Sequence, residues 1–338
     1  MERMKWGIIG CGGIADRRTI PGLVLSDIAK CYAVMDLNQE AVESVKEKYG
    51  AEVGCTDVDT LLKQDIEAVY IATPVGCHKE QAKKAADAGK HILLEKPMGL
   101  TTDDAKEIAD YCQKKGVKLG VGFMMRFHDV HVKIKELIQS GVIGTVVTAY
   151  AKFNDNAPSA ELKWRQYKAN SGGGTMMDMG IHCIDLLQYM TGLKVTEVVG
   201  LCGNQIHKYP DTEDGASAVM RMDNGALFTI EANFNIPDTI GGCKFEIYGT
   251  KGVISAIGTI GQTESGKVML TVMNEDDTVE TKEINYTSGN MYTKEIDGFT
   301  RAIREEIEVP VTAQEGIFNQ KIVEAVYESQ ENGKRIDL

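Results

Sequence analysis

The sequence predicts an α/β protein of two domains, a doubly wound parallel sheet followed by an α+β domain with a large, open and mostly antiparallel sheet. Strand-like and helix-like segments alternate from residue 4 to about 123, and strand-like segments then dominate. In addition, 338 residues exceed what one hydrophobic core usually covers. We therefore expect domains at 1–123 and 124–338.

The chain opens with an apolar strand that enters a glycine-rich turn, Gly10-x-Gly12-x-x-Ala15. Gly10 permits a tight turn, Gly12 carries no side chain that would block a pyrophosphate, and small Ala15 lets the following helix pack closely on the strand. The first turn of that helix offers unpaired N–H groups and a positive dipole to phosphates. The pattern predicts a dinucleotide-binding Rossmann domain; a glycine-rich turn in an ordinary α/β domain is the alternative.

A carboxylate stands at the end of the second predicted strand. The run from Lys30 to Met35 ends at Asp36, roughly 20 residues past Ala15, the spacing expected for a ribose-binding acid. Such a carboxylate can accept hydrogen bonds from both adenosine ribose hydroxyls, and it repels a 2′-phosphate. We therefore expect the cofactor to be NAD, with NADP disfavoured.

Two later strands end in polar residues where an open parallel sheet has its ligand crevice. The strand at 66–72 leads to Thr73 and His78, and His78 is either near the cofactor or a helix-start residue. The strand at 91–94 leads to Lys96, which is either a surface group or a partly desolvated ammonium that bonds a substrate oxygen. The predicted cofactor-binding residues are Gly10, Gly12, Gly13, Ile14, Asp36, Thr73, Pro74, His78, Glu95 and Lys96.

Composition and charge exclude several classes of function. Lys and Arg number 37 against 49 Asp and Glu, and the net charge of −12 argues against nucleic-acid and anionic-membrane partners and for a small neutral substrate. Eight scattered cysteines without C-x-x-C, and histidines without H-x-x-x-H spacing, predict reduced thiols and no metal site. With no leader and no apolar run of membrane-spanning length, we expect a cytoplasmic protein.

The second half of the chain reads as a wide sheet with few helices. The segments 216–222 and 226–233 flank Asn224-Gly225, a strong hairpin signal, and further strands follow to about 284. Helices are expected at about 292–306 and 314–331. Because so few helices leave one sheet face partly uncovered, we expect a homodimer or homotetramer.

A second group of candidate residues follows the glycine triplet Gly172-Gly173-Gly174. Asp178 and His182 are four residues apart, so they share a face if this segment opens a helix. A carboxylate can then orient the imidazole, which is the natural general base near neutral pH. Asp185 is the competing partner, and a helix-start Asp178 with a core His182 is the alternative reading.

Together these motifs resemble those of the glucose-fructose oxidoreductase, inositol dehydrogenase and MocA family. The resemblance spans nearly the whole chain and rests on Gly10-x-Gly12-x-x-Ala15, Ala72-Thr73-Pro74 with His78, Glu95-Lys96-Pro97, Gly122-Phe123 followed by Arg126-Phe127, Trp164-Arg165, and Gly172-Gly173-Gly174 leading to Asp178-x-Gly180-x-His182-x-x-Asp185. It implies a Rossmann domain, a C-terminal α/β domain whose open sheet makes oligomer contacts, and a site between them. It also implies that Lys96, Asp178 and His182 are catalytic and that Lys96-Pro97 can be a cis peptide. Members commonly have Asn and Arg where this chain has Met124 and Met125, which makes this wall of the site more apolar.

The leading hypothesis is reversible oxidation of a secondary alcohol on a sugar, polyol or inositol-like ring, with hydride passing to the nicotinamide. His182 would take the hydroxyl proton, Asp178 would hold His182, and Lys96 would polarise the oxygen. The candidate substrate-binding residues are Arg126, Trp164 and Arg165. One alternative is an NAD-dependent glycosidase that couples transient oxidation to elimination. Another is a non-catalytic regulator that senses a dinucleotide or a sugar.

Overall fold

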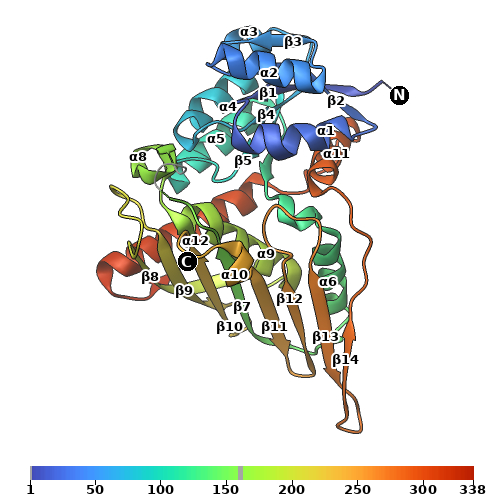
Figure 1. The fold of residues 1–338 in the computed structure, drawn as a ribbon, viewed down its shortest axis with the longest axis vertical. Helices are drawn as coiled ribbons and strands as arrows, with labels where there is room; N and C mark the ends of the chain where they lie inside the picture. The colour runs from blue at the N-terminus through green and yellow to red at the C-terminus, as the bar shows by residue number, and fades with distance from the viewer. Residues whose placement is uncertain (1, 159–162) are drawn as a thin grey trace. The chain divides into compact units, whose positions relative to one another are not determined.

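The computed structural model describes residues 2–158 and 163–338, and within these ranges the chain divides into two compact units. The first unit comprises Met1–Met124 and Asn290–Phe318, and the second comprises Met125–Gly289 and Asn319–Leu338 (Figure 1). The sequence analysis placed one boundary after residue 123. The structure shows in addition that the chain returns to the first unit at Asn290.

The described part of the first unit forms a parallel sheet of six strands in the order β3-β2-β1-β4-β5-β6. Its strands are β1 (Met4–Ile9), β2 (Ala29–Met35), β3 (Val53–Cys55), β4 (Ala68–Ile71), β5 (His91–Glu95) and β6 (Leu119–Gly122). The chain steps outward from β1 to β3 and then returns to place β4 on the other side of β1. This reversal confirms the predicted doubly wound sheet, and the ligand crevice of such a sheet lies where the order reverses.

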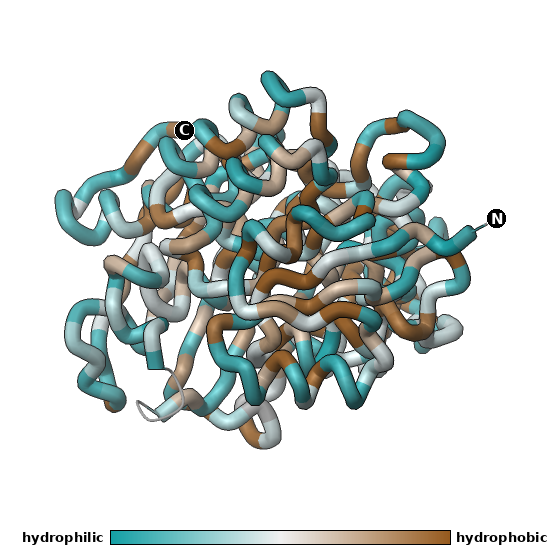
Figure 2. The backbone as a smooth tube through the Cα atoms, turned by 90° about the horizontal axis from the view of Figure 1, so that it is seen from above, coloured by the Kyte–Doolittle hydropathy of each residue, from teal (hydrophilic) through white to brown (hydrophobic). Residues whose placement is uncertain are grey.

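Helices join these strands, and α5 shows how capping residues in the sequence set the ends of a helix. They are η1 (Ala15–Thr19), α1 (Ile20–Val24), α2 (Gln39–Tyr49), α3 (Val58–Leu62), η2 (Val75–Cys77), α4 (His78–Asp87) and α5 (Thr102–Lys115). The hydroxyl of Thr101 accepts the N–H of Asp104 at the start of α5, and Gly116 ends that helix in the left-handed region with φ +70°. Hydrophobic and hydrophilic stretches alternate along the backbone in Figure 2, as expected of helices with one buried face.

Helix α11 (Met291–Arg304) belongs to the first unit because its apolar face packs on that unit's core. The rings of Phe299 and Trp6 meet edge to face with their centroids 5.7 Å apart. A Cβ on Gly22 would lie 2.7 Å from the Cβ of Tyr292, and a Cβ on Gly120 would lie 2.8 Å from the Phe299 ring. Glycine at these two positions therefore lets α11 approach α1 and β6 closely, and α1 and α11 lie side by side in Figure 1.

The described part of the second unit holds a nine-stranded sheet in the order β14-β13-β12-β11-β7-β10-β9-β8-β15. Its strands are β7 (Val146–Asn154), β8 (Val195–Gly203), β9 (Gly215–Met222), β10 (Leu227–Asn233), β11 (Lys244–Gly249), β12 (Gly252–Ile257), β13 (Lys267–Met273), β14 (Val279–Glu283) and β15 (Ile336–Asp337). Among these described strands, β7 and β10 form the one parallel pair, so the predicted mostly antiparallel sheet is confirmed. The predicted hairpin at Asn224-Gly225 joins β9 to β10.

Helices cover one face of this sheet and leave hydrophobic side chains on the other. The longer ones are α6 (Asp129–Gln139), α9 (Ile181–Thr191) and α12 (Ala313–Asn332), and the shorter ones are η3 (Met124–Phe127), η4 (Lys163–Gln166), α8 (Lys168–Ser171), η5 (Met176–Gly180) and α10 (Asp238–Gly241). Val326 of α12 packs on Gly200 of β8. Val199, Leu201 and Val219 are exposed on the uncovered face. Within the described ranges, every helix is too short or too polar to pass through a lipid bilayer.

The first unit also buries a carboxyl group on α11. The Glu295 side chain is 2% exposed, and its Oε1 has no hydrogen-bond partner within the described ranges. Burial and the nearby Glu95 carboxylate hold the pKa of Glu295 well above its usual value. Burial and a nearby negative charge therefore both favour the protonated form of this carboxyl group.

We expect Glu295→Gln to stabilise the protein at pH 8. Because the pKa of Glu295 is raised in the folded state, its favourable contribution is complete below the pKa of the unfolded chain and is lost as pH rises toward the folded pKa. A neutral amide removes that loss, so the free energy of unfolding should rise by roughly 1–3 kcal/mol at pH 8 and by less at pH 5. Urea unfolding at both pH values measures this. The exposed control Glu47→Gln should change it by less than about 0.5 kcal/mol; a Glu295→Gln protein less stable than wild type at pH 8 would contradict a neutral carboxyl.

Candidate active site

The glycine turn after β1 is tight at one glycine and open at another. Gly10 has φ +100°, and a Cβ there would lie 2.8 Å from the carbonyl oxygen of Ala72 at the end of β4. At Gly12, no described atom beyond the chain neighbours lies within 4 Å of the position that a Cβ would take. The turn leads directly into a helix whose first turn, η1, is a π-helix. These features fit a pyrophosphate, which needs close approach to a backbone and free N–H groups at a helix start.

Asp36 lies against the glycine turn. Its Oδ2 accepts the backbone N–H of Cys11 at 2.9 Å, and its Oδ1 accepts that of Asn38 at 3.0 Å. The carboxylate therefore stands at the end of β2, beside the turn, with acceptor capacity left for other donors. This arrangement fits a ribose with two free hydroxyls.

His78 joins the loops that follow β4 and β5. Its ring nitrogens lie 3.0 Å from the carbonyl oxygen of Thr73 and 3.1 Å from that of Pro97, and the side chain is 1% exposed. Burial lowers the pKa of His78 to about 4, so the ring is neutral at physiological pH. His78 also begins α4, which was one of its two expected roles. Its contact with a cofactor stays a prediction.

Lys96 follows β5 and is tied into a chain of hydrogen bonds through its own backbone. The Lys96-Pro97 peptide is cis, as the resemblance implied. The carboxylate of Glu95 accepts the Lys96 N–H at 3.2 Å and the hydroxyl of Tyr70, and that tyrosine oxygen accepts the hydroxyl of Thr19 at 3.0 Å. Thr19 is the last residue of η1, so these bonds connect the glycine-turn helix to the end of β5.

In the second unit, η5 and α9 carry Asp178 and His182 on one continuous helical run. The predicted helix is present, although its first turn is a π-helix. Asp178 Oδ2 lies 3.3 Å from the Nε of Arg165, whose guanidinium carbon lies 4.4 Å from the centroid of the Trp164 ring. His182 is 5% exposed, and its ring centroid lies 6.2 Å from that of Phe153. Thus the structure brings Trp164, Arg165 and Asp178 together.

Arg126 and Asp185 form a buried ion pair. Nε and Nη2 of Arg126 donate to the Asp185 carboxylate at distances of 2.5 to 3.1 Å, and the side chains are 7% and 2% exposed. The amide of Asn319 donates a further bond to Asp185 at 2.7 Å. Asp185, the competing partner considered for His182, is therefore engaged by Arg126. A substrate contact of Arg126 stays a prediction.

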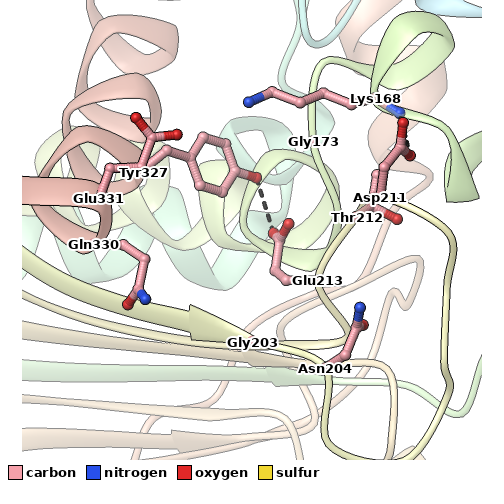
Figure 3. A pocket seen from close by; sticks show the side chains of 10 residues that line it. All are labelled: Lys168, Gly173, Gly203, Asn204, Asp211, Thr212, Glu213, Tyr327, Gln330 and Glu331. Atoms are coloured by element: carbon pink, nitrogen blue, oxygen red, sulfur yellow. Dashed lines mark hydrogen bonds between the residues drawn. The ribbon is translucent and has the colours of Figure 1, made fainter.

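Two residues that hold the glycine triplet were not predicted from the sequence. Glu213 accepts backbone N–H groups of Gly174 and Met176, and the hydroxyl of Tyr327 donates to the same carboxylate (Figure 3). They line an open pocket of about 300 Å³ with Lys168, Gly173, Gly203, Asn204, Asp211, Thr212, Gln330 and Glu331. The glycine triplet itself was the available signal, since it marks a place where other groups come close to the backbone.

Within the described ranges, no three His, Cys, Asp or Glu side chains form a cluster that could hold a metal ion. A doubly wound sheet with a glycine turn and an acid at the end of its second strand, joined to a unit with a mixed sheet, defines the class of two-domain oxidoreductases that use NAD(P). Residues 4–123 match the model "Oxidoreductase family, NAD-binding Rossmann fold", and residues 135–338 match "Oxidoreductase family, C-terminal alpha/beta domain". The chain belongs to this family, the Gfo/Idh/MocA oxidoreductases.

Similar proteins carry the names of sugar and inositol dehydrogenases. The chain is 27% identical to D-xylose 1-dehydrogenase (NADP(+)) 2 of Haloferax volcanii over 99% of this chain and 100% of that protein. It is 32% identical to myo-inositol 2-dehydrogenase of Thermotoga maritima over 75% of each. Its fold matches that of an aldose-aldose oxidoreductase from Caulobacter crescentus complexed with glycerol, with a TM-score of 0.91, 22% identity and 100% of both chains covered.

We expect Arg126→Ala to destabilise the protein strongly. The substitution leaves the Asp185 carboxylate buried without its cation, and such a loss costs about 3–5 kcal/mol of the free energy of unfolding. Denaturant unfolding measures it. The exposed pair of Arg221 with Glu197 supplies the matched control, and Arg221→Ala should cost no more than about 1 kcal/mol. Equal losses in the two variants would contradict this expectation, because they would mean that another group compensates the Asp185 charge when Arg126 is removed.

Proposed function

We propose that the protein is an NAD-dependent dehydrogenase that transfers a hydride between the nicotinamide and a secondary alcohol of a sugar, polyol or inositol-like ring. The proposal depends on one observation above all. A chain of this family carries a half-buried lysine at the end of β5 and a carboxylate and an imidazole four residues apart on one helical run. These are the groups that proton transfer to and from a hydroxyl requires. The names of the xylose and inositol relatives support the substrate class.

The residues around the glycine turn would hold the cofactor. Gly10, Gly12, Gly13 and Ile14 would bind the pyrophosphate, and Asp36 would bind the adenosine ribose. Thr73, Pro74, His78, Glu95 and Lys96 complete the proposed set. The nicotinamide, when bound, supplies the hydride acceptor for oxidation and the hydride donor for reduction.

The chain's own residues would manage the proton. His182 would accept the hydroxyl proton during oxidation, and Asp178 would hold the imidazole in the required orientation and stabilise its charged form. The ammonium of Lys96 would donate a hydrogen bond to the reacting oxygen. In reduction the same groups act in the opposite direction. Trp164 and Arg165, which contact each other beside Asp178, would bind the rest of the substrate, with Arg126.

The uncovered sheet face supports a homodimer or homotetramer. Val199 and Val219 are paired across β8 and β9, and both are exposed, as is Leu201. An exposed group of apolar side chains on a sheet is typical of a contact between subunits. The scattered cysteines agree with a reducing compartment such as the cytoplasm.

We expect Lys96→Ala and His182→Ala each to lower kcat by about 100- to 10,000-fold, since each removes a group from proton transfer. The substrate is first found by screening sugars, inositols, sugar acids and glycosides for NADH formation. The Kd of NADH, measured by fluorescence titration, should stay within about threefold of wild type. Lys63→Ala, an exposed lysine, is the control and should retain full turnover. Unchanged kcat in either test variant would remove that residue from the mechanism.

The cofactor preference is tested with Asp36→Asn. The amide keeps an acceptor for the Cys11 N–H but loses the negative charge that repels a 2′-phosphate. We expect the ratio of kcat/KM for NAD to that for NADP to fall by at least about tenfold, which corresponds to roughly 1.4 kcal/mol. Glu47→Gln removes one exposed charge from α2 and should leave the ratio unchanged. A wild-type enzyme that prefers NADP would overturn the assignment of Asp36.

A further inference from the structure

The turn before η5 is built so that two distant side chains can reach its backbone. A Cβ on Gly173 would lie 2.2 Å from the hydroxyl oxygen of Tyr327, which belongs to α12. A Cβ on Gly174 would lie 2.1 Å from the carbonyl oxygen of Glu213 and 2.7 Å from its carboxyl carbon. Any residue larger than glycine would therefore displace Glu213 or Tyr327. These contacts account for glycine at both positions.

Glu213 satisfies the backbone donors at the start of the helical run. Its Oε2 accepts the N–H of Gly174 at 2.9 Å, and its Oε1 accepts that of Met176 at 2.9 Å. Its own carbonyl oxygen accepts the N–H of Thr175 at 3.2 Å. The first N–H groups of a helix have no partner within the helix, so a residue from outside supplies all three acceptors here. The Asp178 N–H then bonds the carbonyl of Gly174 at 2.9 Å, which continues the same turn.

Tyr327 completes the set of donors around this carboxylate. Its hydroxyl donates to Glu213 Oε1 at 2.8 Å, and Figure 3 shows the tyrosine hydroxyl pointing at this carboxylate. Glu213 is 9% exposed, and burial raises its pKa, while the bonds from Met176, Tyr327 and Gly174 oppose that rise. Two backbone N–H groups and one hydroxyl point at the two oxygens. An ionised carboxylate, which only accepts, suits three donors.

We propose that Glu213, held by Tyr327, is a positioning residue that fixes the turn from which Asp178 and His182 are presented. This inference rests on the proposed function of Asp178 and His182. A shift of the turn would move both side chains together, because they follow it on one continuous helical run. Small displacements of a catalytic group can lower rates by about 100-fold.

The test is a double-mutant cycle between Glu213 and His182. In Glu213→Gln an NH₂ group replaces one of the two carboxylate oxygens and then faces a backbone N–H group of the turn. Because two donors cannot bond each other, the turn must shift. We expect kcat to fall about 10- to 100-fold, with the Kd of NADH within threefold of wild type and a cooperative unfolding transition retained. In the His182→Ala background, Glu213→Gln should lower kcat by less than twofold further, because no imidazole remains to be positioned. Multiplicative losses, or full kcat in Glu213→Gln, would overturn the proposal.

Asp214 provides a matched control. It is fully buried, and its carboxylate accepts the N–H groups of Gln205, Ile206 and His207, in a loop without proposed catalytic residues. Asp214→Asn should lower the Tm and leave kcat within twofold of wild type. A comparable kcat loss in this variant would show that any buried carboxylate change acts through general loss of structure.

Tyr327→Phe keeps the proposal testable where Glu213→Gln does not fold. It removes one donor to Oε1 and leaves both backbone bonds in place, so we expect a kcat loss of about 3- to 10-fold that disappears in the His182→Ala background. The failure of this inference is distinct from failure of the proposed function. If Lys96→Ala and His182→Ala lower kcat as expected while the Glu213 and Tyr327 variants behave as wild type, the dehydrogenase stands and the positioning role falls.

Discussion

In both units a carboxylate from another part of the chain accepts one or more backbone N–H groups of a glycine-rich turn, and each turn is followed by candidate site residues. Asp36 accepts the Cys11 N–H in the first unit, and Glu213 accepts those of Gly174 and Met176 in the second. Hydrogen bonds to a charged acceptor are worth about 1.5–3 kcal/mol, and a buried N–H left without a partner costs a similar amount. Each turn is thereby held in one conformation at the point where a helix begins.

In both turns glycine permits a close approach that a larger residue would block. A Cβ on Gly10 would lie 2.8 Å from the carbonyl oxygen of Ala72, so glycine allows this close approach of two backbone segments. Gly174 in the same way leaves room for the Glu213 carboxyl group. The two turns differ in what lies beside the other glycines. At Gly12 the space beside the backbone is open, which fits a phosphate, whereas at Gly173 and Gly174 protein groups occupy it. Glycine-rich turns of similar composition thus leave open space beside the backbone in one unit and admit protein side chains in the other.

The sequence predicted those features that depend on local pattern. Strands β4 and β5 lie where the apolar runs at 66–72 and 91–94 predicted them, and the Asn224-Gly225 hairpin joins two antiparallel strands as expected. The short strand β3 and the terminal β15 were not predicted, because a few residues show no periodicity. The place of α11 in the first unit, the Arg126–Asp185 pair and the Glu213–Tyr327 bond join residues far apart in sequence. Spacing along the chain contains no signal for such pairs.

Two acids of the first unit, Glu95 at the end of β5 and Glu295 of α11, lie near each other, and Glu95 directly precedes Lys96 in the sequence. Glu95 accepts the Tyr70 hydroxyl and the Lys96 N–H, whereas Glu295 Oε1 has no hydrogen-bond partner within the described ranges. Burial and the proximity of Glu95 raise the pKa of Glu295, which disfavours a second negative charge beside Glu95. Helix α11, which joins the first unit from the far end of the chain, thus brings a carboxyl group near the residue that precedes Lys96.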